Sequence, residues 1–353
     1  MNSCENSVVR RLPAEWEAQD GVLLTWPHDQ SDWRPFLAQV EPVYVEIARA
    51  ICARERLLVC VRDAPHQRHV RALLDGGGVT PARTELCIAA SNDSWARDHG
   101  PITVCDGGSP RLLDFRFNGW GGKYAAELDD RISTTLAAAG SFGVTPLEAI
   151  DFVLEGGAIE SDGAGVLLTT STCLLEPGRN PAFSRLQIEQ RLGELFGLQR
   201  VLWLEHGYLE GDDTDSHIDT LARFCDPGTI AYVRCDDPHD THHAALATME
   251  QELIALRDIR GVPYRLVPLP WPAAKRNAEG KRLPATYANF LVINGAVLVP
   301  TYRDVADRVA LAQIAHCFPG REIIAIDCLP LIQQYGSLHC ITMQLPAGVL
   351  APL

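Results

Sequence analysis

The stretch Gly21-Val-Leu-Leu-Thr-Trp26 is a short apolar run of the length and composition typical of a buried β-strand. A helical pattern follows it, with apolar residues at spacings of three and four: Phe36, Val40, Val43, Ile47 and Ile51. A second strand-like run, Leu57-Leu-Val-Cys-Val61, comes next. This order of strand, amphipathic helix and strand predicts an α/β fold in which helices cover a sheet.

The same alternation continues to the end of the chain. Further strand-like runs occur at Leu112 to Phe117, Val166 to Thr169, Val201 to Leu204, Thr229 to Val233, Phe290 to Val299 and Glu322 to Ile326. Helical patterns lie between them at Pro181 to Phe196, Leu246 to Leu256 and Asp304 to Ile314. No Ser/Gly-rich linker interrupts the pattern, so we expect one domain over residues 1–353. The strand-strand-helix order recurs roughly every sixty to seventy residues, which favours a ring of similar modules.

Composition excludes several classes of protein. The chain has 353 residues, of which 46% are hydrophobic, so it can bury a large core. No apolar run approaches the roughly 18 residues needed to cross a bilayer, and residues 1–16 lack the apolar segment of a signal peptide, so we expect a cytoplasmic protein with no membrane partner. A formal charge of −14 argues against nucleic acid and mildly favours a cationic ligand.

Eleven cysteines occur singly, without a CxxC pair. That spacing predicts reduced thiols rather than a disulfide framework or a zinc site. Residues 236–243, Asp-Asp-Pro-His-Asp-Thr-His-His, are rich in metal-ligating types, yet Thr241 before a helical pattern is typical of an N-cap. The acids from Asp212 to Asp215 do not have the spacing of a calcium-binding EF-hand. We therefore expect no metal and no cofactor.

One cysteine has a different setting, in Tyr335-Gly336-Ser337-Leu338-His339-Cys340-Ile341-Thr342. Cys340 follows a glycine-opened turn and precedes an apolar strand, and such a position can expose a nucleophilic thiol. In an extended strand, neighbouring side chains point to opposite faces, so His339 is a poor proton-transfer partner for Cys340. The partner should come from another part of the chain.

Three other segments could carry chemistry. Trp95-Ala-Arg-Asp98-His-Gly-Pro101 ends in a Gly-Pro turn of the kind found at a sheet rim, although a surface turn is the simpler interpretation. Phe117-Asn-Gly-Trp120-Gly-Gly-Lys-Tyr124 lacks the spacing of a phosphate-binding loop and is better explained as a shaped loop that presents Trp120. In Leu154-Glu155-Gly-Gly157, the glycines would allow close backbone packing while Glu155 turns into a cavity; an ordinary turn is the alternative.

The segment Gly211-Asp212-Asp-Thr-Asp-Ser-His217-Ile-Asp219 is the richest in acid-base groups. On a strand, His217 and Asp219 would share one face, where an imidazole and a carboxylate suit proton transfer beside a bound cation. A solvated acidic loop followed by an edge strand is the alternative. Pro270 to Pro284 has no periodicity and holds three prolines and four basic residues, so it is either an active-site lid or a surface insertion.

Seven separated motifs, in order and spacing, resemble the agmatine deiminase and bacterial peptidylarginine deiminase family over nearly the whole chain. They are Pro13-Ala-Glu-Trp16, Trp95-x-Arg-Asp98-x-Gly-Pro101, Glu155-Gly-Gly157, Arg179-Asn-Pro181, Asp213-Thr-x-x-His217-x-Asp219, Tyr287-Ala-Asn-Phe290 and Gly336-x-x-His339-Cys340-Ile-Thr342. The resemblance implies the pentein fold, a five-bladed β/α propeller around a central polar channel.

The resemblance also implies roles for residues. Cys340 would be the nucleophile and His217 the general acid and base, while Asp98, Asp219 and Glu155 would be the carboxylates that hold a guanidinium. Trp95 and Trp120 are expected to contact the substrate, and Asp213 would lie near its amine. The implied reaction is hydrolytic deimination of agmatine through a covalent amidino-thioether on cysteine, with a small cationic guanidino compound as the partner; a homo-oligomer is left open.

Two departures from the family pattern concern substrate choice. Asp215-Ser216 stands where Asn-Gly is expected, and Trp26-Pro-His-Asp29 where Trp-Pro-Glu-Arg is expected. The rival substrate is arginine in a peptide. An amidinotransferase would use the same thiol chemistry but pass the amidino group to an amine. From a different class, a protein could keep the cation pocket without turnover, although retention of the thiol, the imidazole and the carboxylates argues against that.

Overall fold

The computed structural model describes residue 4 and residues 9–351. Within them the strands form five sheets of three or four strands and one short hairpin. Four sheets follow one plan, in which an antiparallel pair is extended by a parallel strand. These sheets are β4 (Ile102–Asp106), β5 (Ser109–Arg116) and β6 (Leu147–Val153); β7 (Ile159–Ser161), β8 (Val166–Thr170) and β9 (Arg200–Leu204); β10 (Ala222–Asp226), β11 (Thr229–Val233) and β12 (Arg265–Leu269); and β15 (Leu291–Ile293), β16 (Ala296–Thr301) and β17 (Glu322–Asp327).

The fifth sheet joins the two ends of the chain. Its order is β18 (Thr342–Pro346), β1 (Gln19–Thr25), β2 (Arg56–Val61) and β3 (Thr84–Ile88), with β18 antiparallel to β1 and the remaining neighbours parallel. The C-terminal strand therefore repeats the antiparallel-then-parallel plan with the N-terminal strands as partners. The mixed α/β class and the recurring module are confirmed, whereas closure of the five sheets into a propeller stays a prediction.

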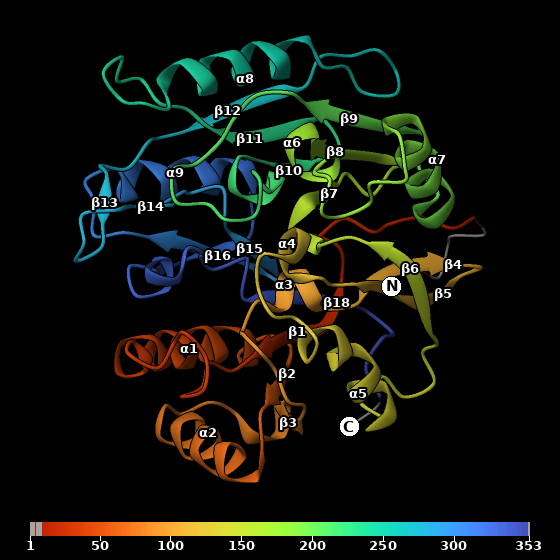
Figure 1. Ribbon diagram of the computed structural model, residues 1–353, viewed down its shortest axis with the longest axis vertical. Helices are drawn as coiled ribbons and strands as arrows, with labels where there is room; N and C mark the ends of the chain where they lie inside the picture. The colour runs from red at the N-terminus through yellow and green to blue at the C-terminus, as the bar shows by residue number, and fades with distance from the viewer. Residues whose placement is uncertain (1–3, 5–8, 352–353) are drawn as a thin grey trace.

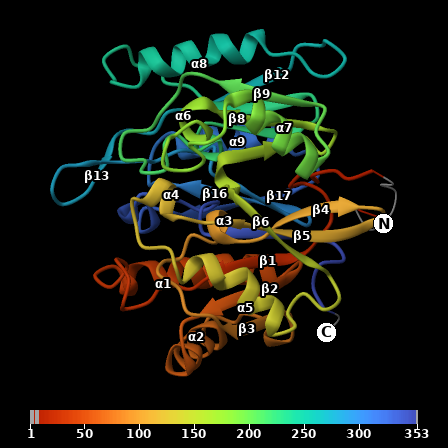
Figure 2. The ribbon, with the colours of Figure 1, turned by 45° about the vertical axis from the view of Figure 1, so that its right-hand side comes forward.

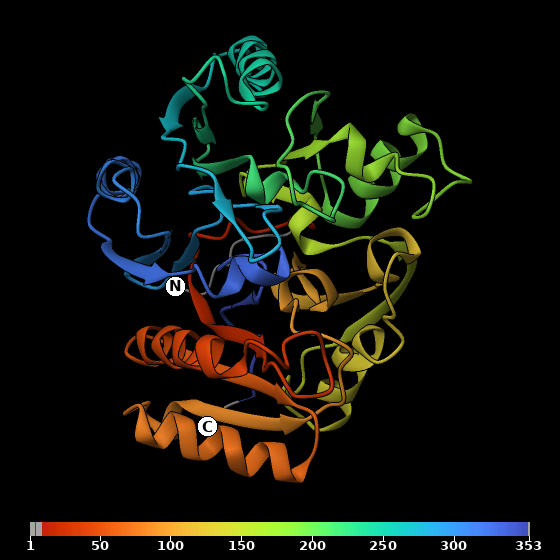
Figure 3. The same ribbon diagram turned by 60° about the vertical axis from the view of Figure 1, so that its left-hand side comes forward.

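The longer helices cover the outer faces of the sheets (Figure 1). The longer ones are α1 (Leu37–Cys52), α2 (Ala64–Gly76), α5 (Ile132–Ala138), α7 (Arg185–Phe196), α8 (His243–Ala255) and α9 (Asp307–Cys317), and the short ones are α3 (Ala96–His99), α4 (Gly119–Gly122) and α6 (Ser171–Leu174). Of the short helices, α3 and α4 lie near the middle of the molecule. Figure 3 shows α1, α8 and α9 at the rim and the segment before β18 near the middle. The predicted apolar stripe of α1 is buried, because Val40, Val43, Ile47 and Ile51 face the core. No helix in the described part of the chain is long and apolar enough to cross a membrane.

Two predicted elements have different boundaries in the structure. The run Phe290 to Val299 is not one strand, because Asn294 and Gly295 form a tight turn between β15 and β16, and Gly295 has a φ of 72°. Helix α8 begins at His243 without a side-chain cap, so the prediction of Thr241 as its N-cap is wrong. In that segment, Asp240 instead accepts hydrogen bonds from the backbone N–H of His242 (3.0 Å) and from Arg282.

The expectation that all thiols are reduced is wrong. Cys4 and Cys105 are joined by a disulfide, whereas the nine other cysteines are free and buried. The two cysteines are 101 positions apart, and an N-terminal segment lies along β4 through the bridge between Arg11 and Cys105. That tertiary contact leaves no signature in cysteine spacing, so the pairing is invisible in the sequence. Disulfides are typical of oxidising compartments.

The segment from residue 270 to residue 284 contains the short hairpin of β13 (Lys275–Arg276) and β14 (Arg282–Leu283). Figure 2 shows the hairpin projecting from the body of the protein. The ammonium group of Lys281 lies 4.1 Å from the centre of the Tyr335 ring. The hairpin is therefore anchored beside Tyr335, next to the pocket described below.

Candidate active site

One pocket brings together most of the residues singled out in the sequence. Its empty volume is about 650 Å³, counting the open mouth. Side chains from the segments before β18, around α3 and α4, and before β10 meet there. The residues that line it are Asp32, Asp93, Trp95, Asp98, Trp120, Tyr124, Asp212, Asp213, Thr214, His217, Thr220, Gln334, Tyr335, Gly336 and Cys340.

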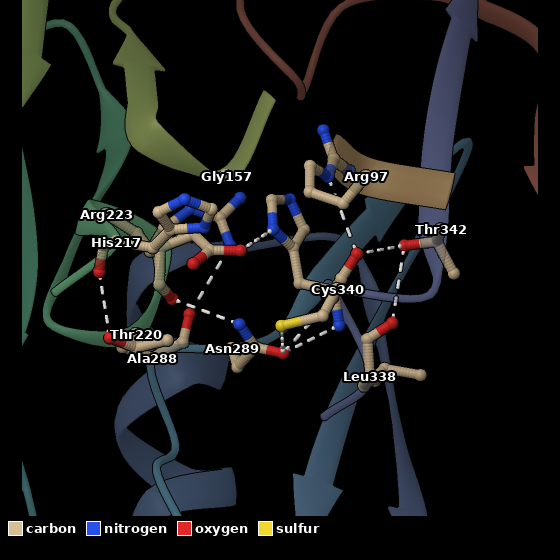
Figure 4. Close-up of polar contacts among 12 residues, drawn as sticks. Arg97, Gly157, His217, Thr220, Arg223, Ala288, Asn289, Leu338, Cys340 and Thr342 are labelled. Carbon is tan, nitrogen blue, oxygen red and sulfur yellow. Dashed lines mark hydrogen bonds and ion pairs between the residues drawn. The ribbon is translucent and has the colours of Figure 1, made fainter. Parts of the chain in front are cut away.

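Cys340 lies in a turn before β18, because that strand begins only at Thr342. The Asn289 side-chain oxygen accepts hydrogen bonds from the His339 N–H (2.8 Å), the Cys340 N–H (3.4 Å) and the Cys340 thiol (3.4 Å), so one amide group fixes the whole turn (Figure 4). The prediction that His339 does not serve Cys340 agrees with this geometry, but its reason, strand alternation, is wrong. His339 turns away because two carboxylates on the far side hold its ring.

The glycine at position 336 is needed where the turn opens. A Cβ atom there would lie 2.1 Å from the ring of Trp95, so only glycine allows the indole to pack against the turn. Trp95 also packs against the buried Trp33 at a ring distance of 5.6 Å. Trp95 therefore forms a rigid wall of the pocket that Cys340 also lines, and its contact with a substrate stays a prediction.

The resting thiol of Cys340 is strongly protonated. Burial raises its pKa well above the usual range, and the negative charges of Asp219 and Asp98 raise it further. A thiolate would form readily only if a positive charge entered between the thiol and these carboxylates.

Asp98 is held rigidly at the floor of the pocket. One carboxylate oxygen accepts the backbone N–H of Gly157 (3.1 Å), and the other accepts the indole N–H of Trp120 (3.0 Å). Burial raises the pKa of Asp98 to about 6, although the charge of His217 opposes the shift. The carboxylate is therefore mostly ionised at neutral pH and fixed in direction, as the recognition of a planar cation requires.

His217 lies beside Asp98, with Nδ1 3.6 Å from the Asp98 carboxylate. Burial by itself would lower the pKa of His217, but the effects of Asp98, Cys173 and Glu155 together outweigh it, and the pKa rises to about 10. The ring is therefore protonated at neutral pH and can donate a proton to a leaving group. A Cβ atom at residue 157 would lie 2.5 Å from this ring, so the predicted close packing of the Glu155-Gly-Gly157 backbone is confirmed.

The strand expected at His217 to Asp219 is absent from this segment. Residues Ile218–Thr220 form a 3-10 turn instead, and His217 and Asp219 point to different surroundings. His217 lines the pocket, whereas Asp219 is fully buried behind it and accepts a hydrogen bond from His339 Nδ1 (2.7 Å). The alternation argument fails because the chain leaves the extended conformation at this point.

Glu155, predicted as one of the carboxylates that hold a guanidinium, pairs with a buried arginine and does not line the pocket. Arg179, from the Arg179-Asn-Pro181 motif, donates from Nε to both Glu155 oxygens (3.0 and 2.9 Å), and both side chains are fully buried. The Cys173 sulfur, a Glu155 oxygen and a His217 ring nitrogen lie within 4.8 Å of one another. Because Arg179 already neutralises Glu155, this cluster is an ion-paired support behind His217 rather than an attractive site for a metal cation.

The departure at Asp215-Ser216 has a structural explanation. Both residues have positive φ angles, 68° and 65°, in the region that Asn and Gly adopt most easily. Hydrogen bonds hold this strained turn: Asp215 accepts from Arg179 (2.7 Å) and Lys123 (2.6 Å), and the Ser216 N–H donates to Asp212 (2.7 Å). The substitution thus keeps the backbone that carries His217.

The mouth of the pocket is acidic. Asp213 accepts a hydrogen bond from the hydroxyl of Tyr124 (2.8 Å), and both residues line the mouth. Asp212 is mostly engaged in its own loop through Thr214 and Ser216. Of the three acids before His217, Asp213 is therefore the one best placed to meet a ligand.

Sequence reasoning gave no role to three residues that hold this site. Arg179, Asn289 and Glu15 each fall inside a recognised motif, but nothing in the local pattern shows what they contact. The Nε2 atom of His339 lies 2.6 Å from an oxygen of Glu15, across 324 positions of sequence. Only the tertiary structure brings these partners together.

The sequence and the fold of this chain are similar to those of several known proteins. The chain is 34% identical to the Vibrio parahaemolyticus protein named "Putative agmatine deiminase", over 95% of this chain and 96% of that protein. It is 52% identical to a solved structure from Porphyromonas gingivalis described as "Putative Arginine Deiminase", with a TM-score of 0.91 and coverage of 97% and 100%. A cysteine-to-serine variant of C. jejuni agmatine deiminase, solved with substrate bound, is 35% identical, with a TM-score of 0.89 and coverage of 97% of both chains.

These relatives are deiminases, a class of enzymes that act on guanidino C–N bonds. Residues 11–346 match the family model of the Porphyromonas-type peptidyl-arginine deiminases. The chain therefore belongs to the Porphyromonas-type peptidyl-arginine deiminase family.

Proposed function

We propose that this protein hydrolyses agmatine to N-carbamoylputrescine and ammonia. The observation that carries the proposal is the pocket lining, where a thiol, a protonated imidazole and a fixed carboxylate converge beneath a mouth rich in acids. Five aspartates and no lysine or arginine line this pocket. Such a lining favours a substrate that is positive at both ends, as agmatine is, over one that ends in a carboxylate.

In the proposed reaction, Asp98 and Asp219 hold the guanidinium through its N–H groups and fix its central carbon against the Cys340 sulfur. The cation offsets the two negative charges that raise the pKa of the thiol, so the thiol releases its proton to solvent and becomes a thiolate when substrate is bound. The sulfur attacks the carbon, and the C–N bond to one terminal nitrogen breaks. His217 gives that nitrogen a proton, and ammonia leaves from an amidino-thioether.

The second half-reaction uses the same groups in the opposite sense. His217, now neutral, takes a proton from water, which attacks the amidino carbon. The C–S bond then breaks, the proton of the newly added hydroxyl group passes to the sulfur and restores the thiol, and the neutral ureido product is released. One water molecule is consumed and one ammonia is formed. No residue outside the pocket lining and Asp219 is needed for a chemical step.

Arginine within a peptide is the second candidate substrate, because the family is described by that activity. A blocked arginyl peptide lacks the free carboxylate that the acidic mouth would repel, so it must be tested separately. Incubation with agmatine, free arginine and a blocked arginyl peptide, scored for ureido product and ammonia, separates the candidates. The proposal expects agmatine to give the highest kcat/KM; a higher value for the peptide would overturn the choice of substrate while keeping the chemistry.

We expect Asp213→Asn to raise the KM for agmatine and to narrow its advantage over free arginine. A unit charge pair at about 4 Å contributes roughly 1 kcal/mol in water and about 4 kcal/mol near a protein surface. The loss of selectivity should therefore lie between roughly fivefold and several hundredfold. The effect on kcat should be smaller, because the amine tail does not react. Steady-state kinetics with both substrates measure this.

Asp236→Asn is the matched control for overall charge. Asp236 is exposed and pairs with Arg234 outside the pocket, so its removal changes the net charge equally without altering the mouth. An agmatine-to-arginine ratio within twofold of wild type in Asp213→Asn would refute the role of Asp213, as would an equal change in the control.

The acid limb of the pH profile should reflect Asp98. Its carboxylate must be ionised to hold the guanidinium, and burial raises its pKa to about 6, so kcat/KM should fall as the pH drops through about 6. Asp93 also lines the pocket, and burial raises its pKa to about 6 as well. The limb should persist in Asp93→Asn if Asp98 is responsible. A wild-type profile that stays flat down to pH 5 would contradict this expectation.

A further inference from the structure

His339 links two buried carboxylates directly behind the thiol. Its Nδ1 lies 2.7 Å from an oxygen of Asp219, and its Nε2 lies 2.6 Å from an oxygen of Glu15. The ring is 1% exposed. Both nitrogens are therefore committed to carboxylates, and neither is available to exchange a proton with Cys340.

The network of contacts continues beyond Glu15 and reaches a strand, or the segment just before a strand, of each of the five larger sheets. Glu15, which precedes β1, also accepts hydrogen bonds from Arg223 of β10 (2.9 Å) and from the backbone of Val292 in β15 (2.7 Å). Arg223 in turn donates to Glu160 of β7 (2.7 Å). The remaining member is Arg97 of α3, just before β4, whose guanidinium lies 3.6 Å from Glu15.

A network of buried ion pairs and hydrogen bonds fixes the positions of its side chains. Burying a charged group without partners costs several kcal/mol, so each member is held where its partners are. Because the members lie in, or just before, strands of five different sheets, they cannot move independently. The network therefore fixes the position of the His339 ring relative to the surrounding sheets. Through its hydrogen bond, His339 in turn fixes the position of the Asp219 carboxylate.

Asp219 has one oxygen held and one oxygen free. His339 occupies Oδ2, whereas Oδ1 is buried and meets no hydrogen-bond partner in the described part of the chain. The Asn289 side chain links Asp219 to the thiol, because its amide nitrogen donates to the Asp219 backbone oxygen (3.4 Å) and its oxygen accepts from Cys340 (3.4 Å). The charge of Asp219 also acts on Cys340 and on Asp98. A free oxygen beside the thiol and a second carboxylate is the arrangement expected of one half of a guanidinium clamp.

We propose that His339 is a positioning residue, which holds the carboxylate of Asp219 so that its free oxygen accepts a hydrogen bond from the substrate guanidinium. The proposal rests on the proposed function, in which Asp219 grips the substrate. His339 touches neither the substrate nor the reacting atoms. It acts through Asp219 alone.

The surrounding charges determine how Asp219 titrates. Burial by itself would raise the pKa of Asp219, but the hydrogen bond from His339 together with the charges of His339, His217 and Arg223 outweighs burial, so the pKa is lowered. Loss of the His339 donor should let the pKa rise, and the carboxylate would then be protonated at a higher pH. The other charged groups that act on this pair are Glu15, Arg97, Arg223, His217 and Asp98.

Two substitutions at His339 form a matched pair. The amide nitrogen of asparagine is as many bonds from Cβ as Nδ1 of histidine, so His339→Asn can keep a donor toward Asp219. The amide nitrogen of glutamine corresponds to Nε2, so His339→Gln keeps a donor toward Glu15 and loses the bond to Asp219. A residue that only fills space would not distinguish the two.

For His339→Gln we expect the KM for agmatine to rise about tenfold to a hundredfold, as for loss of a charged hydrogen bond, with a smaller change in kcat. The acid limb of kcat/KM should move to higher pH. His339→Asn should keep a KM near that of wild type. In an Asp219→Asn background, His339→Gln should add nothing further to KM, because the two changes remove one interaction.

His242→Gln is the control for loss of a buried histidine. His242 is 1% exposed and also contacts a carboxylate, Asp240 at 2.7 Å, but it lies outside the pocket. The KM of the His242→Gln variant for agmatine should therefore equal that of wild type. Equal KM values for His339→Asn and His339→Gln would overturn the inference. If His339→Gln does not fold, a tenfold rise in KM for His339→Asn alone would still refute it. A wild-type enzyme without ureido product from agmatine would instead refute the proposed function, and the inference with it.

Discussion

Replacing Cys340 with alanine should abolish turnover and leave agmatine binding intact. The sulfur forms the covalent bond, whereas Asp98 and Asp219 hold the cation, and neither depends on the thiol for its position. Replacing the thiol also removes no charge from the pocket, because the resting thiol of Cys340 is neutral. Turnover should fall below about one part in a thousand of wild type. Steady-state kinetics and titration calorimetry with agmatine measure the two properties.

A haloacetamidine probe provides the complementary result. Its cationic head should enter between the two carboxylates, so it should label Cys340 alone among the eleven cysteines. Cys60→Ala is the matched control, because Cys60 is fully buried in β2 and its pKa is also raised by burial. Labelling of another cysteine, or turnover by Cys340→Ala above one part in a thousand, would refute the assignment of the nucleophile.

His217→Asn should lower kcat by about 10²- to 10⁴-fold, the usual contribution of general acid-base catalysis. The imidazole must give a proton to ammonia and later take one from water within a single cycle. Binding should change less, because the guanidinium is held by carboxylates. Rapid-quench measurement of ammonia, together with calorimetry, separates the chemical step from binding.

His339→Asn is the natural comparison, since this histidine is next to the nucleophile in sequence. Its ring faces Asp219 and Glu15 rather than the thiol, so the loss in kcat should be much smaller than for His217→Asn. A larger loss of kcat in His339→Asn would show that the proton-transfer group has been misassigned.

The fold class was predictable because it depends on local patterns. The apolar period of α1 and the compact runs of β1, β2 and β11 place each element within a few residues of its observed bounds. Where a turn interrupts an apolar run, as at Asn294 and Gly295, the pattern conceals the break, because the residues on both sides are equally apolar.

The site was predictable only in part. Motif order identified Cys340, His217 and Asp98, and the structure places all three in one pocket. The surroundings of Glu155 and Asp219 depend on partners far away in sequence, namely Arg179 and His339. A carboxylate that binds a buried arginine and one that awaits a substrate have the same local sequence, so only tertiary structure distinguishes them.

Trapping the covalent intermediate tests the central claim most directly. Wild-type protein mixed with agmatine, quenched in acid within one turnover and digested should yield a single modified peptide, which contains Cys340 and is heavier by the mass of agmatine less ammonia. The adduct should disappear at the rate at which N-carbamoylputrescine forms. Formation of the ureido product without any adduct, or with an adduct on a different residue, would contradict the account.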